Sequence, residues 1–65
     1  MALEELWLKF MSYPDRVEFF DRDANVLDCI EDKSEMDKYV GENGDLTVVN
    51  FEVDFDPSVL RVELE

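Results

Sequence analysis

The sequence contains no histidine and only one cysteine, Cys29, among its 65 residues. The commonest catalytic base and metal ligand is therefore missing, and neither an internal disulfide nor a zinc site of several cysteines can form. Ser-His and Cys-His catalytic pairs are excluded, and two glycines leave no glycine-rich phosphate loop. We therefore predict a non-enzymatic protein without a cofactor, in a reducing, cytoplasmic setting.

Basic residues and long apolar runs are also scarce. Six Lys and Arg stand against eighteen Asp and Glu, giving a net charge of −12, so direct binding to nucleic acid or to an anionic membrane is not expected. No stretch approaches the roughly 20 apolar residues of a membrane-spanning helix, and the first residues lack the basic start of a secretory signal. The expected partners are basic surfaces or metal cations.

Apolar residues are plentiful enough for a folded domain, because 46% of the residues are hydrophobic and eight are aromatic. A chain this short is only marginally stable alone, so oligomerisation would supply further burial. We expect a single domain over residues 1–65.

The clearest pattern is the alternation within residues 46–55. Every second position from residue 49 is apolar, namely Val49, Phe51, Val53 and Phe55. A period of two is typical of a half-buried strand, and β-branched and aromatic residues favour it. We predict the longest strand of a small sheet, with the rest of the chain packed on its apolar face.

A second pair of strands is predicted as a hairpin over residues 16–20 and 26–31. Pairing Phe20 with Val26 sets Glu18 opposite Asp28 on the polar face. The apolar face then carries Val17, Phe19, Leu27 and Cys29. This pattern predicts that Cys29 is a small core residue.

Helices are predicted on either side of this hairpin. Residues 2–12 are predicted to form a helix, which Pro14 ends. Its core-facing stripe of apolar side chains at helical spacing comprises Leu3, Leu6, Trp7, Phe10 and Met11. Residues 34–40 form a short second helix, with Ser34 as the N-cap and Gly41 just beyond the end. The alternative is a strand at residues 38–42, because the Asn-Gly pair that follows is a strong hairpin signal.

The long strand is followed by a turn and a last strand at residues 59–63. The expected register pairs three apolar residues with three others: Phe55 with Leu60, Val53 with Val62, and Phe51 with Leu64. On the polar face it sets Asp54 opposite Arg61, as an ion pair, and Glu52 opposite Glu63. The predicted fold class is α+β, with a four-stranded antiparallel sheet of two hairpins packed on the two helices.

The predicted hairpins place carboxylates opposite one another, which destabilises a sheet slightly. Same-face residues of a strand lie about 7 Å apart, close to the spacing of successive phosphates along a nucleic acid. The candidate acidic face comprises Glu18, Asp28, Glu52, Asp54, Asp56 and Glu63. We predict that it engages a basic surface, on a nucleic-acid-binding protein, and inhibits or regulates that protein as a nucleic-acid mimic.

A second hypothesis is a small homo-oligomeric structural or adaptor subunit, whose acidic face only keeps it soluble. Its apolar interface would comprise Trp7 and Leu8 of the first helix, with Phe20 and Val26 on the otherwise polar sheet face. Halophilic adaptation also produces acidic sequences. The charge alone does not distinguish these explanations.

One short pattern concerns calcium. Asp21, Asp23 and Asn25 have the opening spacing of a calcium loop, with Asp32 at its twelfth position. Val26 replaces the glycine that the loop requires, and strands flank it in place of helices. We therefore predict a plain hairpin turn and no metal site.

A second pattern concerns nucleases. Pro14-Asp15 with Glu31-x-Lys33 resembles the Pro-Asp…Glu-x-Lys signature of a large nuclease family, whose carboxylates hold Mg²⁺. The resemblance covers five positions of the chain. A net charge of −12 would repel a nucleic-acid substrate, so we do not expect nuclease activity.

Overall fold

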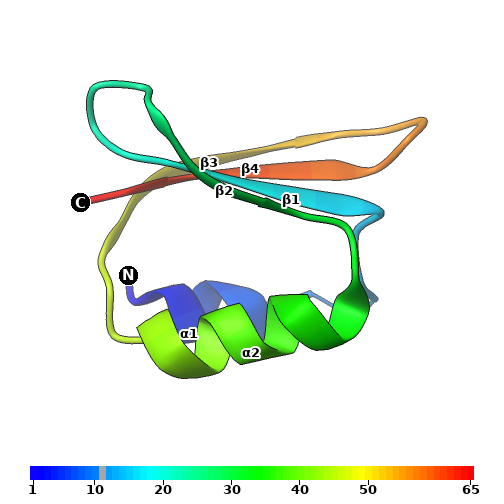
Figure 1. The fold of residues 1–65 in the computed structure, drawn as a ribbon, viewed down its shortest axis with the longest axis horizontal. Helices are drawn as coiled ribbons and strands as arrows, with labels where there is room; N and C mark the ends of the chain where they lie inside the picture. The colour runs from blue at the N-terminus through cyan, green and yellow to red at the C-terminus, as the bar shows by residue number, and fades with distance from the viewer. Residues whose placement is uncertain (11) are drawn as a thin grey trace.

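The computed structural model describes residues 1–10 and 12–65. Its elements follow the order α1 (Leu3–Trp7), β1 (Arg16–Phe20), β2 (Val26–Ile30), α2 (Lys33–Asn43), β3 (Val48–Asp54) and β4 (Val59–Leu64). The strands form one sheet, and both helices lie against the same face of it (Figure 1). The described residues confirm a small α+β fold with two helices and four strands.

The sheet is mixed, so the prediction of an entirely antiparallel sheet is wrong. Its strand order is β2-β1-β4-β3, and the central strands β1 and β4 run parallel, with Arg16 opposite Val59. Both hairpins are antiparallel, as predicted. Hairpin patterns specify only the pairing of consecutive strands, and they leave open which strands of the two hairpins meet.

In the second hairpin the buried, central strand of the sheet is β4, and the long alternating strand β3 lies at the edge. Leu60 and Val62 of β4 are 1% and 0% exposed. Phe51 and Phe55 are 44% and 80% exposed, because β3 lies at the edge of the sheet and Phe55 lies in the turn after it. β3 has seven residues and is the longest described strand, as predicted, but it does not organise the core.

The register between β3 and β4 differs from the predicted one by two residues. Val53 pairs with Leu60, whereas the prediction paired it with Val62. A second bulge, between Val48 and Asn50, places Val48 in the core in place of Val49. From Asn50 to Asp54 the even shift keeps each residue on its predicted face. It changes the polar pairs, however, because Glu52 now lies opposite Arg61.

A bulge changes the register between β1 and β2. The pairing of Phe20 with Val26 is confirmed, but the register shifts directly after it. The extra residue moves each later pair by one, so Ile30 takes the place opposite Val17 that was predicted for Cys29. Ile30 is buried and Cys29 is exposed. The prediction of Cys29 in the core is therefore wrong.

The first helix is shorter than predicted. α1 ends at Trp7, after which Lys9 and Phe10 donate backbone hydrogen bonds to residues three positions earlier. This spacing is that of a tighter 3₁₀ turn, which is common at helix ends. The predicted range to residue 12 also included Met11, which lies outside the described residues.

The second helix is confirmed, and the alternative strand at residues 38–42 is wrong. Its N-cap is Asp32 and not Ser34: the Asp32 carboxylate accepts hydrogen bonds from the backbone N–H groups of Ser34 and Glu35, at 2.8 and 3.3 Å. Gly41 lies within the helix, which continues to Asn43.

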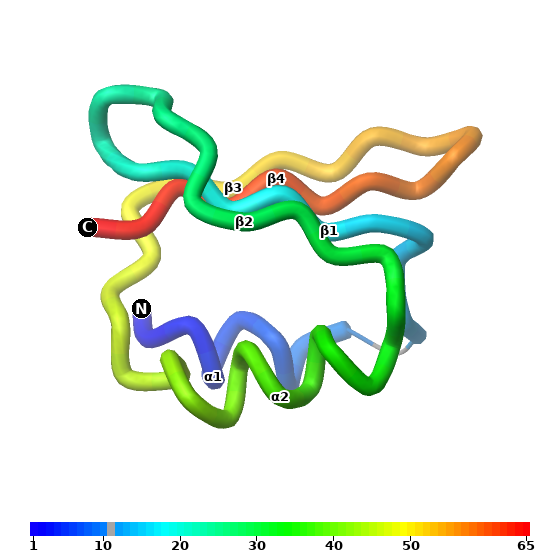
Figure 2. The backbone as a smooth tube through the Cα atoms, viewed as in Figure 1, coloured from blue at the N-terminus to red at the C-terminus, as the bar shows by residue number. Residues whose placement is uncertain are grey.

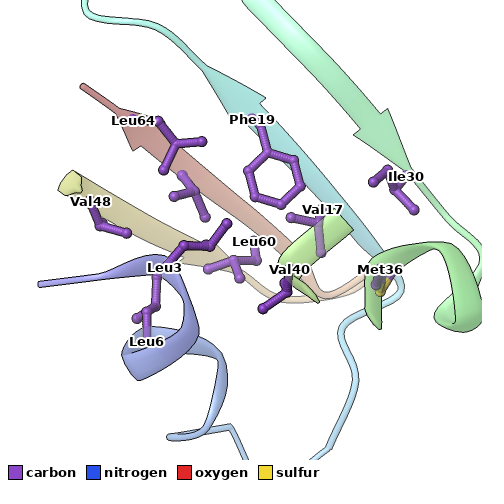
Figure 3. Packing of buried hydrophobic residues seen from close by; sticks show 11 residues of the cluster. Leu3, Leu6, Val17, Phe19, Ile30, Met36, Val40, Val48, Leu60 and Leu64 are labelled. Carbon is purple, nitrogen blue, oxygen red and sulfur yellow. The ribbon is translucent and has the colours of Figure 1, made fainter. Parts of the chain in front are cut away.

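The core lies between the sheet and the two helices (Figure 3). It comprises Leu3, Leu6, Val17, Phe19, Ile30, Met36, Val40, Val48, Leu60, Val62 and Leu64, from all six elements. Tyr39 of α2 stacks on Phe19, with ring centroids 4.2 Å apart. No described element covers the opposite face of the sheet (Figure 1).

Both ends of the chain lie at one end of the sheet (Figure 2). Ala2 forms an antiparallel bridge with Thr47, and the Glu65 N–H donates to the Thr47 carbonyl at 3.0 Å. The segment that leads into β3 therefore fastens both termini.

Candidate functional site

The uncovered sheet face carries a row of charged side chains across three strands. Glu18 of β1, Arg61 of β4 and Glu52 of β3 occupy matching register positions. Arg61 Nε donates to Glu18 at 3.0 Å, and the same guanidinium binds Asp54, which confirms the predicted ion pair. The guanidinium Nη2 of Arg16 lies 3.2 Å from the carboxylate Oε2 of Glu18. Arginines thus occupy the middle of this face, with carboxylates around them.

A cavity of about 230 Å³ opens on this face beside the β1–β2 turn. Its lining residues are Phe20, Asp21, Ala24, Asn50, Phe51, Glu52, Arg61 and Glu63. It brings Glu52 and Glu63 of the candidate acidic face together with Phe20, which was assigned to the apolar interface. The predicted facing of Glu52 and Glu63 is wrong, since Glu63 lies opposite Asn50.

Two residues of the predicted acidic face lie elsewhere. Asp28 pairs with Phe19 and not with Glu18, because of the bulge. It lines a separate cavity with Tyr39 of α2, and burial, together with the nearby Asp28 carboxylate, raises the pKa of Tyr39. Asp56 lies in the turn between β3 and β4 with a left-handed φ of 60°, so the regular strand spacing ends before it.

The four residues of the predicted apolar interface do not form one patch. Trp7 and Leu8 line a cavity beside the end of α1, whereas Phe20 and Val26 belong to the β1–β2 hairpin. Leu8 is 83% exposed and Val26 63%. Four side chains that were predicted on the core face of the sheet are also exposed, namely Leu27, Val49, Phe51 and Phe55.

The residues of the calcium-like pattern stabilise the backbone in two separate places. The Asp21 carboxylate accepts hydrogen bonds from the backbone N–H groups of Asn25 and Asp23, both at 2.9 Å, and these bonds lower the pKa of Asp21. Asp32 follows the far end of β2 and caps α2, where bonds from the Ser34 hydroxyl and then from the backbone lower its pKa. They do not gather into one loop.

Asp15 of the nuclease-like pattern also forms hydrogen bonds that hold the backbone in place. The carboxylate of Asp15 accepts a hydrogen bond from the Ser58 N–H at 3.1 Å, and the Asp15 N–H donates to the Ser58 hydroxyl at 3.1 Å. These bonds tie the start of β1 to the start of β4. Within residues 1–10 and 12–65, no group of three or more His, Cys, Asp or Glu is placed to hold a metal ion.

A second cavity was not predicted. It measures about 310 Å³ and is lined by Trp7, Leu8, Phe10, Ser12, Tyr13 and Asp37. Asp37 of α2 accepts hydrogen bonds from Trp7 and Tyr13, and the Tyr13 bond, with burial and the Asp37 charge, raises the pKa of Tyr13. The sequence predicted Trp7 and Phe10 on a core-facing stripe, but it carried no signal that joins them to Asp37.

Comparison with known proteins gives no assignment: no family model, no curated protein and no solved structure matches this chain. No helix of the described residues has the length and apolar character needed to cross a membrane.

Proposed function

We propose that this protein is a non-enzymatic acidic binding protein that engages the basic surface of a nucleic-acid-binding protein and regulates or inhibits it. One observation carries the proposal: fifteen of the eighteen Asp and Glu side chains are exposed, and none is buried. Among the described residues, only the carboxylates of Glu18, Asp54 and Glu65 lie within 4.0 Å of an arginine or lysine nitrogen. Folding therefore leaves most of the negative charge uncompensated.

Uncompensated charge of one sign raises the energy of the folded chain and attracts a surface of the opposite sign. Such complementarity speeds association and selects against partners of the same sign. A reducing, cytoplasmic setting suits the exposed thiol of Cys29.

Within the acidic face, direct contact with the partner is assigned to Glu52, Asp56 and Glu63. Glu18 and Asp54 are already bound by Arg61, so they position that arginine and have less charge to offer. Glu52 and Glu63 both line the 230 Å³ cavity. A basic side chain of the partner can enter this cavity, while Asp56 meets the partner from the β3–β4 turn.

The test begins with capture of partners from a native lysate at low salt and elution in a salt step. The eluted protein is then bound to DNA or RNA, and the acidic protein is added as a competitor. We expect it to displace the nucleic acid, with an affinity that falls steeply as salt rises.

Charge reversals locate the contact. The triple change Glu52→Lys, Asp56→Lys and Glu63→Lys is expected to weaken competition by more than about tenfold. The matched control, Glu4→Lys, Glu35→Lys and Glu42→Lys, makes the same change of net charge on the helices and should have a much smaller effect. Equal losses would refute the assigned face, and an eluted protein that keeps its nucleic acid would refute the mimicry.

Exposed apolar side chains on both edge strands favour a second candidate function, self-association. Val26 and Leu27 lie on β2, and Val49 and Phe51 lie on β3. Because each copy carries a charge of −12, self-association should strengthen with salt, as screening weakens repulsion. Sedimentation at low and high salt separates this outcome from binding to a basic partner.

Two side chains oppose self-association by edge pairing. The side-chain amide oxygen of Asn50 accepts a hydrogen bond from the Phe51 N–H at 2.9 Å, and the Asp28 carboxylate accepts one from the Cys29 N–H at 2.8 Å. Each bond occupies a backbone donor on an edge strand, which is then less able to pair with another chain. Self-association is therefore the second choice.

A further inference from the structure

Three aromatic rings gather beside the end of α1, away from the acidic sheet face. The ring centroid of Trp7 lies 6.3 Å from that of Phe10 and 5.7 Å from that of Tyr13, with interplanar angles of 58° and 67°. The three rings thus present surfaces in different directions. Together with Asp37 they line the cavity of about 310 Å³, which lies within the size range of small-ligand sites.

Asp37 supplies a negative charge to this cavity. Trp7 Nε1 donates to one carboxylate oxygen at 3.2 Å, and the Tyr13 hydroxyl donates to the other at 2.5 Å. Both donors are neutral, so the bonds orient the carboxylate without cancelling its charge. Since both oxygens are engaged, a cation bound here gains most from the ring surfaces and from the charge itself.

Lys33 places a cation over one of these rings, that of Tyr13. Its Nζ lies 5.8 Å from the ring centroid of Tyr13, within the range of cation–π interactions. Lys33 is not among the described residues that line the cavity. Among the described residues, no lysine or arginine lines the cavity itself.

We propose that this cavity receives an arginine side chain of a basic protein. The guanidinium group is planar, weakly hydrated and stacks on aromatic rings, whereas the lysine ammonium is compact and strongly hydrated. Entry into an aromatic cavity with no unengaged carboxylate oxygen therefore costs arginine less hydration. The inference goes beyond the proposed function, because it assigns a second contact on the helical side of the protein. This contact would prefer arginine to lysine.

Trp7 is the only tryptophan of the chain, so its fluorescence reports directly on the cavity. The purified protein is titrated with hexa-arginine and with hexa-lysine, both capped at their ends, at equal ionic strength. We expect hexa-arginine to bind about five- to tenfold more tightly. It should also change the emission of Trp7 and protect Trp7 from quenching by acrylamide, whereas hexa-lysine should not.

Arginine also binds surface carboxylates in a bidentate manner, so the preference must be traced to the rings. Tyr13→Phe keeps the ring and loses the hydrogen bond to Asp37, and it should retain the arginine preference within about twofold. Tyr13→Leu removes the ring and should reduce the preference to about one. Circular dichroism checks the folding of both variants. The protection of Trp7 from quenching is measured on the unmodified protein, so that test does not depend on whether the variants fold.

The outcomes separate the two proposals. Equal protection of Trp7 by both peptides, or an arginine preference that survives Tyr13→Leu in the folded variant, overturns the cavity assignment. Equal, salt-dependent binding of both peptides with unchanged Trp7 emission also overturns it, but leaves the acidic binding function standing. If neither peptide binds at low salt, both proposals fail.

Discussion

Glu18 of β1 and Arg61 of β4 are joined across the parallel strand pair by a hydrogen bond of 3.0 Å. Arg61 also binds Asp54 of β3, so one guanidinium connects three strands. The Glu18 side chain is only 19% exposed, and water screens such a pair less than a fully exposed one. The arrangement stabilises the sheet and, at the same time, covers part of its negative charge.

Replacement of Arg61 should therefore have two opposite effects. We expect Arg61→Gln to lower the free energy of unfolding by about 1–2 kcal/mol, measured by urea denaturation, because two ion pairs are lost. The same change should strengthen binding to a basic partner, since Glu18 and Asp54 are uncovered. Arg22→Gln is the matched control, because among the described carboxylates Arg22 reaches only that of Glu65, at 3.8 Å with both side chains exposed. Equal effects of the two changes would contradict a special role of Arg61.

The two glycines should respond to alanine in opposite directions. A Cβ atom added to Gly41 meets nothing within 4 Å, whereas one added to Gly44 lies 2.7 Å from the Val40 carbonyl oxygen and 3.1 Å from Glu4 Cβ. Gly41→Ala should stabilise the protein by about 1 kcal/mol through helix propensity. Gly44→Ala should destabilise it by about 1–3 kcal/mol through overpacking. Thermal unfolding of both variants tests this, and a stabilising Gly44→Ala would disprove the close packing of α1 on α2.

Acid should destabilise the fold through Asp21 and Asp32. Hydrogen bonds lower the pKa of both carboxyls in the folded protein, so their contribution is complete above the ordinary value of about 4 and is lost as the pH falls through the lowered folded pKa. Asp32→Ser keeps a capping oxygen and removes the charge, so it should flatten the acid limb of a stability–pH curve. Asp32→Ala removes the cap as well and should lower the melting temperature at neutral pH. An unchanged acid limb in Asp32→Ser would exclude this carboxyl as a cause.

The bulge in the β1–β2 hairpin can be tested at two adjacent residues. Ile30→Val should cost about 0.5–1.5 kcal/mol, because Ile30 is 5% exposed and packs in the core. Cys29→Ala should change the stability by less than about 0.5 kcal/mol, since Cys29 is exposed. A thiol reagent should label Cys29 in the folded protein. Slow labelling together with a destabilising Cys29→Ala would instead support the predicted register without a bulge.

The backbone conformation of Ala24 offers a test of the β1–β2 turn. Ala24 has a φ of 64°, in the left-handed region that disfavours side chains. Ala24→Gly should therefore raise the free energy of unfolding by about 0.5–1 kcal/mol. A loss of stability in Ala24→Gly would contradict the left-handed turn.

Local patterns in the sequence were sufficient to predict the elements but not their arrangement. Alternation identified the strands, and apolar spacing identified both helices. The parallel contact of β1 with β4 could not be predicted, because it depends on which strands bury their faces most completely in the final fold. The bulge between Val26 and Asp28 was equally invisible, since one extra residue leaves the composition of the strand unchanged.

The candidate site was predicted only in part, because local patterns do not specify contacts between distant elements. The pair of Asp54 with Arg61 survived a register change of two residues because the diagonal contact remained within reach. Glu18 entered the same cluster from β1 through the unpredicted parallel pair. The cavity at Trp7 depends on Asp37, which stands 30 positions away in the sequence and follows no recognisable spacing.

The parallel pairing of β1 with β4 also governs how the chain reaches its fold. It connects residues 43 positions apart, such as Glu18 and Arg61, and closing so long a loop must precede the gain from the contact. Neither hairpin has a complete core without the other, since the buried cluster draws on both. The two halves should therefore fold together in one kinetic step, and fragments cut between α2 and β3 should gain structure only when mixed.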